Sequence, residues 1–431
     1  MLYSELICMR MNIKLAGNFR PWVIAASWVF AVSLLSANCV SAQENKDEAP
    51  RFRLGALEIH PGIDVSVKED TNVFLTNTDT KSDTIMTYVP TVKLSRSFGG
   101  ESDFDVKFKY EIIDYDKFGA EDTENKTVTG NLNFEKINGN GYWRTNGIWE
   151  DTADASSSET QTTTGPRTPR TKGEVDSHVG IGGYDGSKLR LEVSAGLTWN
   201  RYLRAAQDRL ESDLTRGGAL VEYAISPKTN IRVDYEFERQ KYTNRTVDDQ
   251  RDNARDHAIR AGFSFTPSAL ITGHATLGFV RRTFDETIST TDESDRDTNN
   301  ISADVDLTWK WKKGTTVNGT FKSSIESSSS PGQVAYREWE VGGTLTQDLP
   351  FISNNLKFTL NPAYKENIFI RTSRIDNLLT WKAGFKYTAD SKRYPWFASF
   401  DFKDERKFTN ENKGSVEYHD NTYEFKVGIQ Y

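Results

Sequence analysis

Residues 104–112 read Phe-Asp-Val-Lys-Phe-Lys-Tyr-Glu-Ile, so apolar and charged side chains alternate at every position. Apolar residues two positions apart lie on one face of a β-strand, whereas an amphipathic helix spaces them three and four positions apart. A strand with one apolar and one charged face suits a wall that separates lipid from a polar interior. The segment therefore predicts a strand of a membrane-spanning barrel.

This alternation continues through most of the chain after residue 56. In Leu57–Val67, for example, Ile63 and Val65 alternate with Asp64 and Ser66. We predict 18 strands, and this even number would leave both chain ends on the periplasmic side. The predicted strands are Leu57–Val67, Met86–Leu94, Phe104–Ile112, Val128–Phe134, Tyr142–Glu150, Val175–Gly183, Leu189–Trp199, Thr215–Ile225, Ile231–Phe237, His257–Phe265, Ile271–Phe279, Ile301–Trp311, Val317–Ile325, Trp339–Leu345, Leu356–Tyr364, Leu379–Tyr387, Trp396–Phe402 and Tyr423–Tyr431.

The connections between these strands alternate in length, as expected of short periplasmic turns and long extracellular loops. The pattern predicts an all-β fold, a transmembrane antiparallel barrel of about 18 strands (16 to 18). A secreted β-sandwich also has alternating strands and is the competing fold. The short turns lie at 99–100, 138–141, 185–187, 227–229, 266–268, 312–314, 349–355 and 389–395, and the long loops at 69–83, 114–126, 151–172, 201–213, 238–256, 285–300, 327–335 and 404–421.

The N-terminus has the character of a secretory signal peptide. Basic residues precede the apolar run Pro21–Leu35, which is shorter than the ~20 residues of a spanning helix. A small-residue site follows, and we predict cleavage between Ala42 and Gln43. A lipoprotein signal that uses Cys39 is an alternative. The predicted organisation is a signal peptide at 1–42, a periplasmic N-terminal segment at 43–52 and an outer-membrane barrel at 53–431.

Composition excludes several classes of function. Both cysteines, Cys8 and Cys39, lie in the predicted signal peptide, so the exported chain has no disulfide and no thiolate ligand. The formal net charge of -7 argues against nucleic acid as a partner. We expect no cofactor, and we expect outer-membrane lipids and lipopolysaccharide as partners. The oligomeric state is left open.

The last predicted strand ends the chain with an aromatic residue. Its apolar positions alternate with polar ones up to the terminus. We expect the outer-membrane assembly machinery to recognise this strand. The residues of the predicted assembly signal are Tyr423, Phe425, Val427, Ile429 and Tyr431.

The charged positions of the strands are the candidate functional residues. If the apolar positions face lipid, the charged ones face the lumen, because a charge near the bilayer midplane costs about 2–4 kcal/mol. Such charges could orient polar solutes in a transverse field, or they could simply neutralise one another in a narrow or plugged lumen. The predicted lumen-lining residues are Asp105, Lys107, Lys109, Glu111, Arg232, Asp234, Glu236, Asp304, Asp306, Lys310, Lys382 and Lys386.

The start of the predicted barrel resembles a known family. Residues 53–67 read Arg-Leu-Gly-Ala-Leu-Glu-Ile-His-Pro-Gly-Ile-Asp-Val-Ser-Val, and residues 69–74 read Glu-Asp-Thr-Asn-Val-Phe. Lys-Ser-Asp-Thr follows at 81–84. This is similar to the "putative beta-barrel porin" family, whose members open with such a strand, an Asp-x-Asn segment and a Lys-Ser-Asp start of the second strand. The resemblance implies a barrel linked to exopolysaccharide or capsule production.

Enzymatic and metal chemistry find little support in the residue patterns. The chain has no Gly-x-Ser-x-Gly motif, and its five histidines form no pattern typical of metal ligands. Acidic clusters around Asp248 and Asp292 could hold Ca²⁺, although solvated loops are the simpler interpretation. We therefore expect a non-enzymatic porin-like barrel that assists passage of a surface polysaccharide. The alternatives are a general diffusion porin and a plugged barrel that acts through its loops.

Overall fold

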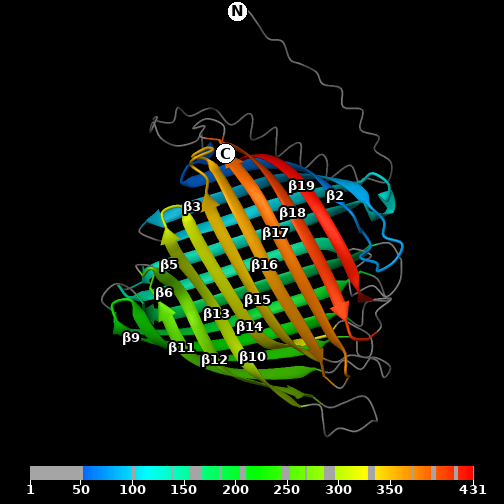
Figure 1. The fold of residues 1–431 in the computed structure, drawn as a ribbon. Coiled ribbons are helices and arrows are strands. Elements are labelled where there is room, and N and C mark those ends of the chain that lie inside the picture. Colours follow the sequence, from blue (N-terminus) through cyan, green and yellow to red (C-terminus); the bar gives the residue numbers. More distant parts are fainter. Residues whose placement is uncertain are drawn as a thin grey trace, which may run out of the picture. The chain divides into compact units, whose positions relative to one another are not determined.

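The computed structural model shows a β-barrel with almost no helix (Figure 1). The short 3₁₀ helix η1 spans Gly119–Glu121. None of these residues forms a helix long and apolar enough to span a membrane. The structure describes residues 52–99, 102–137, 139–154, 167–183, 187–203, 210–243, 253–266, 269–285, 297–328, 335–370, 372–389, 395–411 and 416–430.

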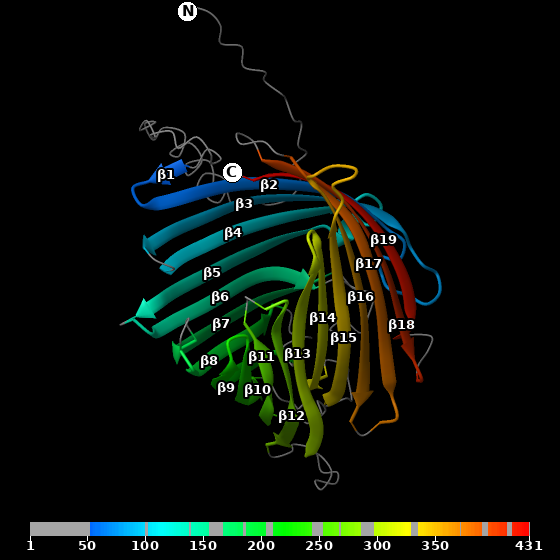
Figure 2. The same cartoon turned by 60° about the vertical axis from the view of Figure 1, so that its left-hand side comes forward.

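The strands follow one another around the wall in sequence order, each antiparallel to its neighbours (Figure 2). The strands are β1 Phe52–Leu54, β2 Leu57–Asp70, β3 Asp83–Gly99, β4 Ser102–Tyr115, β5 Thr123–Ile137, β6 Gly141–Asp154, β7 Thr168–Gly182, β8 Leu189–Tyr202, β9 Ser212–Ser226, β10 Thr229–Tyr242, β11 Ala254–Phe265, β12 Ile271–Phe284, β13 Thr298–Lys312, β14 Thr315–Ser327, β15 Ala335–Asp348, β16 Leu356–Phe369, β17 Ile375–Thr388, β18 Trp396–Thr409 and β19 Tyr418–Gln430.

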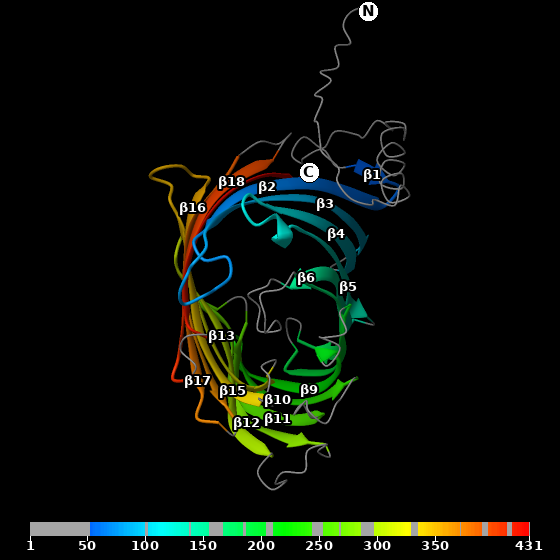
Figure 3. The same ribbon diagram turned by 90° about the vertical axis from the view of Figure 1, so that its right-hand side faces the viewer.

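The last strand closes the wall on the second. Pairing of β19 with β2 runs from Thr422 opposite Asp70 to Gln430 opposite Gly62. The strands β2 to β19 therefore form a closed antiparallel barrel of 18 strands, which confirms the predicted fold class. Figure 3 shows these strands surrounding the interior.

Strand β19 pairs with β2 only as far as Gly62, and the short strand β1 pairs with β2 beyond that point. Its Leu54 pairs with Leu57, and its Phe52 pairs with Ile59. At these positions β3 occupies the other edge of β2, because Ile59 also lies opposite Leu94. The start of the predicted barrel segment 53–431 thus supplies backbone partners just beyond the end of β19.

Most strands are longer than their apolar pattern predicted. The strand predicted at Phe104–Ile112 is β4, Ser102–Tyr115, and other strands also extend into segments predicted as loops. Lys126 and Asp151 illustrate the reason: they were assigned to loops, yet they face each other across β5 and β6 at 3.2 Å. Apolar alternation stops where the membrane would stop, whereas backbone pairing continues into water.

The connections divide the barrel into two ends. We call the end with the short connections and residue 430 the turn end, and the opposite end the loop end. The predicted strict alternation in length is wrong at one place: the loop-end connection 370–374 is shorter than the turn-end connections 349–355 and 389–395. Here β16 and β17 extend beyond the predicted strands and replace much of the expected loop.

Large apolar side chains point away from the barrel. Val193, Leu277 and Phe279 are 61, 62 and 69% exposed. Alternate positions of the same strands carry polar residues, such as Glu192 and Thr276, which are more buried. A protein in water would cover such an apolar surface, so the outward face is suited to lipid.

Two glycines permit a close approach of the backbones of β11 and β12. A Cβ atom at Gly262 would lie 1.9 Å from the carbonyl oxygen of Ala275. At Gly278 it would lie 1.8 Å from the carbonyl oxygen of Ile259. Both positions belong to the inward phase, so only glycine allows the neighbouring backbones to approach this closely on the concave side.

Several sequence-based predictions fall outside the described residues. They include the signal peptide 1–42, its cleavage site at Ala42 and Gln43, the terminal Tyr431 and most of the acidic loop clusters. Four residues of the predicted assembly signal are described, and Tyr423, Phe425 and Val427 point outward with 43, 52 and 39% exposure. Their recognition by assembly machinery stays a prediction.

Substitutions in β19, where it pairs with β2, test whether the outward residues face lipid and the inward residues face the lumen. Phe425 lies opposite Val67 on the outward face, whereas its neighbour Glu424 faces the lumen. We expect Phe425→Arg to lower the free energy of unfolding by about 2–4 kcal/mol, because it places a charge in lipid. Glu424→Arg should cost about 1 kcal/mol or less, since it breaks a half-exposed pair with Lys426 and places a cation opposite Lys68 where lumen water screens the repulsion. Urea unfolding in vesicles, followed by heat-modifiable gel mobility, measures both, and equal losses would contradict this topology.

Candidate functional site

The charged phase of the strands faces the interior. Ser327 of β14 donates a hydrogen bond to Gln240 of β10, although β11, β12 and β13 separate these strands in the wall. Such a contact can only cross the concave side (Figure 3). Because Gln240 shares its phase with Arg232, Asp234 and Glu236, these predicted residues point into the lumen.

The predicted residues of β4 lie on the same inner face and mostly contact polar neighbours. Asp105 accepts a hydrogen bond from Asn131 at 2.9 Å. Lys109 lies 3.1 Å from Glu111. Lys107 is exposed although it faces inward, which indicates that the described lumen has room for water beside β4.

On the opposite wall the predicted residues belong to a chain of ion pairs. Arg260 of β11 binds Asp234 and Glu236 of β10, each at 2.7 Å. Arg232 bridges Asp234 at 3.4 Å and Glu222 of β9 at 3.7 Å. Asp234 is therefore held by two arginines, Arg232 and Arg260.

The chain of pairs continues toward the turn end of β8. Arg190 lies 3.2 Å from Glu222 and 2.6 Å from Glu192. His178 approaches Glu192 at 2.9 Å, and Tyr142 donates to the same carboxylate at 2.6 Å. We call this set the lumen network; it comprises Tyr142, His178, Arg190, Glu192, Glu222, Arg232, Asp234, Glu236 and Arg260.

Farther round the wall, the predicted residues of β13 are partly paired. Asp304 lies 3.0 Å from His274 of β12. Asp306 accepts a hydrogen bond from Asn318 of β14 at 2.7 Å. Lys310, nearer the turn end, is exposed. These residues extend the polar inner surface beyond the lumen network.

The predicted lysines of β17 face other lysines across the sheet. Lys382 lies directly opposite Lys403, and Lys386 lies opposite Lys357. Like charges in such positions destabilise a sheet unless water screens them. Lys382 and Lys386 are both exposed, and Lys386 also lies 4.4 Å from the ring of Phe397. This wall therefore presents positive charge to the lumen.

The loop-end part of β14 turns into the barrel. Pairing of β13 with β14 ends at Ala303 opposite Ser323, whereas β14 stays paired with β15 as far as Ser327. Arg282 of β12 donates to the carbonyl oxygen of Ile325 at 3.0 Å. We call residues 323–327 the inturned segment.

The inturned segment packs on the inner wall and narrows the lumen there. Ile325 and Ala335 form a buried apolar cluster with Ala258 of β11 and Val280 of β12. Beside it lies a cavity of about 230 Å³ that contains both signs of charge. Its charged lining residues are Glu236, Glu238, Asp256, Arg260, Asp304, Lys322 and Glu326.

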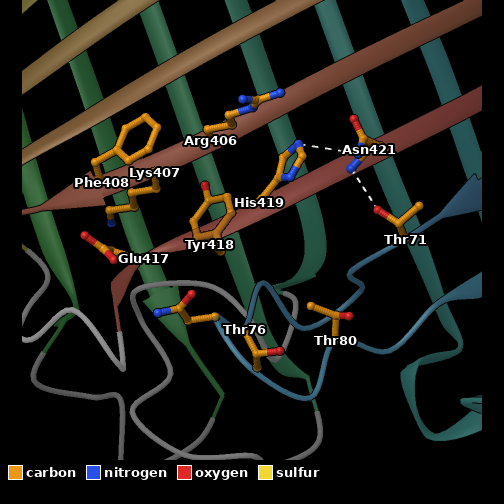
Figure 4. Close-up of a pocket in the computed structure, with 11 residues that line it drawn as sticks. Thr71, Thr76, Thr80, Arg406, Lys407, Phe408, Glu417, Tyr418, His419 and Asn421 are labelled. Carbon is orange, nitrogen blue, oxygen red and sulfur yellow. Dashed lines mark hydrogen bonds between the residues drawn. The ribbon is translucent and has the colours of Figure 1, made fainter.

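A second cavity, of about 450 Å³, lies at the loop end (Figure 4). Tyr418 and Phe408 lie on one side of it, and the connection that carries Thr76 and Thr80 lies on the other. Asn72, only 1% exposed, anchors this connection. Its side chain donates to the carbonyl oxygens of Thr76 at 2.8 Å and of His419 at 3.0 Å.

Residues of the family-like segment organise the connection after β2. Asp70 accepts the backbone N–H of Asn72 at 3.1 Å. Asp83 accepts backbone N–H groups of Lys117 and Phe118, both at 3.0 Å, and the Phe118 ring meets Phe74 edge-on. The Asp-x-Asn and Lys-Ser-Asp patterns are therefore explained here as loop anchors.

Sequence reasoning missed six of the nine residues of the lumen network. Arg190, Glu192 and Arg260 stand at inward positions of predicted strands, so their phase was a usable signal. The sequence could not predict which residues they contact, because those contacts depend on the register between strands. Within the part of the chain that the structure describes, no three His, Cys, Asp or Glu side chains are grouped to hold a metal ion.

The lumen network predicts unequal effects of two similar substitutions. Arg260→Met leaves Asp234 and Glu236 without their shared partner, so we expect the free energy of unfolding to fall by about 1–3 kcal/mol. Lys310→Met removes an exposed inward charge and should change it by less than about 0.5 kcal/mol. Urea unfolding in vesicles measures both values. Equal changes would show that the network contributes nothing beyond an exposed charge.

Solved barrels of comparable extent resemble the chain distantly. The OccK2 (OpdF) structure from Pseudomonas aeruginosa, in complex with glucuronate, is 11% identical, with 87% of this chain and 98% of that chain covered and a TM-score of 0.46. OpdL from Pseudomonas aeruginosa is 10% identical, with coverages of 88% and 99% and a TM-score of 0.46. A BenF-like porin from Pseudomonas fluorescens Pf-5 is 12% identical, with coverages of 88% and 100% and a TM-score of 0.46. Nothing about a shared substrate follows from these similarities.

The comparison with protein families covers the whole barrel. No curated protein matches the sequence. Residues 52–431, however, match the family described as "Putative beta-barrel porin 2". This range contains every strand of the barrel, including the seam between β2 and β19. The chain therefore belongs to this porin family, and it is an outer-membrane β-barrel.

Proposed function

We propose that this barrel is a water-filled channel, not an enzyme, and that small charged hydrophilic solutes cross the outer membrane through it. The lumen network carries the proposal, because it lines one wall with fixed charges of both signs. Barrels of 16–18 strands usually enclose an aqueous channel. The exposure of the inward lysines Lys107 and Lys382 supports a hydrated interior.

The geometry favours solutes that are small and carry charge. The inturned segment 323–327 reduces the space beside β11 and β12, and carboxylates and cations meet there. Across the lumen, β17 presents Lys382 and Lys386. Charges held on opposite walls can orient a solute that carries both positive and negative groups. A simple ion would be attracted to one wall and would cross more slowly.

Passage of a surface polysaccharide, expected from the family resemblance, is the second candidate. A long glycan would gain from aromatic faces along the lumen. Tyr336 points inward, but its ring lies 5.4 Å from that of Phe369, which is only 4% exposed. This pair sits at the loop end and offers little open ring surface. The inward rings of Tyr142 and Phe397 lie under Arg190 and Lys386, so these rings also favour small solutes over a long glycan.

Conduction in planar bilayers tests the channel. The wild-type barrel should conduct, and reversal of two lumen charges by Lys107→Glu and Lys382→Glu should shift the permeability ratio toward cations. One unit charge at 4 Å in water is worth about 1 kcal/mol, so we expect roughly a two- to fivefold change. The reversal potential in a salt gradient gives this ratio.

The matched control is Lys126→Glu. Lys126 pairs with Asp151 on the outward face near the loop end, so reversing its charge should leave the reversal potential unchanged. A silent wild-type bilayer would overturn the channel and favour a plugged barrel that acts through its loops. An equal shift in the control would mean that selectivity does not arise in the lumen.

A deletion strain separates the two candidate solutes. Loss of the barrel should reduce uptake of small charged solutes and leave extracellular polysaccharide unchanged. Both quantities are measured in the same cultures, by labelled-solute uptake and by total surface glycan. Reduced polysaccharide with normal uptake would contradict small-solute passage and favour glycan export.

A further inference from the structure

At the loop end, the outward face of β8 to β12 changes abruptly from apolar to basic. Five cations stand there on neighbouring strands, all in the outward phase. We call this set the basic rim. Its residues are Arg201, Arg239, Lys241, Arg255 and Arg281.

The strand register places the change at one level of the wall. Tyr235, Ile259 and Phe279 lie directly opposite one another across β10, β11 and β12, and they form the last fully apolar row. Two positions farther toward the loop end, His257 stands opposite Arg281. The next outward row pairs Arg239 with Arg255. The boundary therefore runs across several strands and is not a feature of one loop.

Three of the arginines lie at the same separation along their strands from an outward aromatic residue. Each follows an outward aromatic residue by two positions, which corresponds to about 7 Å along a strand. Outward aromatics mark the level where lipid chains meet headgroups. The guanidinium groups thus extend into the headgroup layer. The pairs are Trp199 with Arg201, Phe237 with Arg239, and Phe279 with Arg281.

The rim carries more positive charge than its described neighbours neutralise. Arg239 and Arg255 face each other across the sheet and share Asp285, at 3.8 and 2.9 Å. Among the described residues, Asp213, Asp285 and Asp297 are the acids that contact this set of five cations. Arg281 stays 65% exposed. Asp285 offsets part of the repulsion between the two opposed arginines, and a second anion beside them would offset more of it.

The outward face of β4 to β6 has the opposite balance at the same end. Asp114, Glu124 and Asp151 stand there with one cation, Lys126. Of these two sides of the described barrel, only β8 to β12 carries an excess of positive charge. A general attraction to lipid headgroups would act on every side of the barrel. One bound anionic molecule needs cations on only one side, as observed for these two sides.

We propose that the basic rim binds the phosphate groups of a phosphorylated glycolipid, lipopolysaccharide, in the outer leaflet. The longer connections of outer-membrane barrels face outside, which brings the rim to the level of that leaflet. Arginine suits this ligand because its planar guanidinium can bind two phosphate oxygens at once. A phosphate beside Arg239 and Arg255 would add to the neutralisation that Asp285 provides, and the acyl chains would lie on Tyr235, Ile259 and Phe279 below.

Binding of purified lipid A tests the proposal. The detergent-solubilised full-length barrel is titrated with bisphosphorylated lipid A and with its dephosphorylated form, and bound lipid is counted by native mass spectrometry. Wild-type protein should bind the phosphorylated form at least roughly tenfold more tightly. The triple variant Arg239→Gln, Arg255→Gln, Arg281→Gln should lose that preference.

The control variant is Lys126→Gln, which removes an outward loop-end cation from the acidic side and should keep the preference. Heat-modifiable mobility shows whether the triple variant has folded. If it has not, the wild-type comparison still decides, because equal affinity for the two lipids would overturn the proposal. A folded triple variant that keeps the preference would overturn it as well.

Discussion

The pairing of β19 with β2 is the interaction on which the rest of the structure depends. Inside a bilayer no water is present to bind free backbone groups, so every N–H and C=O must find a partner within the protein. A sheet of this length has two open edges until its last strand meets its first. Residues 422–430 pair with residues 62–70, and this closure allows the whole wall to stand in lipid.

Closure also decides how charge must be distributed. Once the wall is a ring, one phase of each strand faces lipid and the other faces an interior that the strands enclose. Apolar residues occupy the first phase, and the charges are left to satisfy one another in the second. Arg260 binds two carboxylates of the neighbouring strand β10, and Arg232 contacts carboxylates of β9 and β10. The lumen network is thus a consequence of closing the wall into a ring.

The sequence predicted what depends on local periodicity. Alternation located all 18 strands of the barrel and placed residues such as Lys107 and Asp234 on the inner face. It shortened the strands, because residues such as Lys126 lie above the membrane and no longer alternate with apolar neighbours. Periodicity along one strand contains no information on register, so the partners of Arg190 and Glu222 could not be predicted.

The inturned segment marks a second limit. Residues 323–325 belong to the predicted strand Val317–Ile325, so a regular place in the wall was expected for them, while residue 327 was predicted to start a loop. Their departure from β13 depends on partners far away in the sequence: Arg282 holds a backbone carbonyl, and Gln240 meets Ser327. The loop anchors Asn72 and Asp83 are similar, because the family resemblance singled out these residues while only the structure shows what they hold.

The central claim is that one phase of the wall meets lipid while the other meets water in the lumen. The most direct measurement is a spin-label scan along β10, with single cysteines at consecutive positions 231–238 of a chain whose natural cysteines, Cys8 and Cys39, lie before residue 43. Collision rates with oxygen and with a water-soluble nickel chelate should alternate with a period of two. Oxygen should dominate at Val233 and Tyr235, and the chelate at Asp234 and Glu236. Rates without this alternation, or the chelate dominating at every position, would contradict the account.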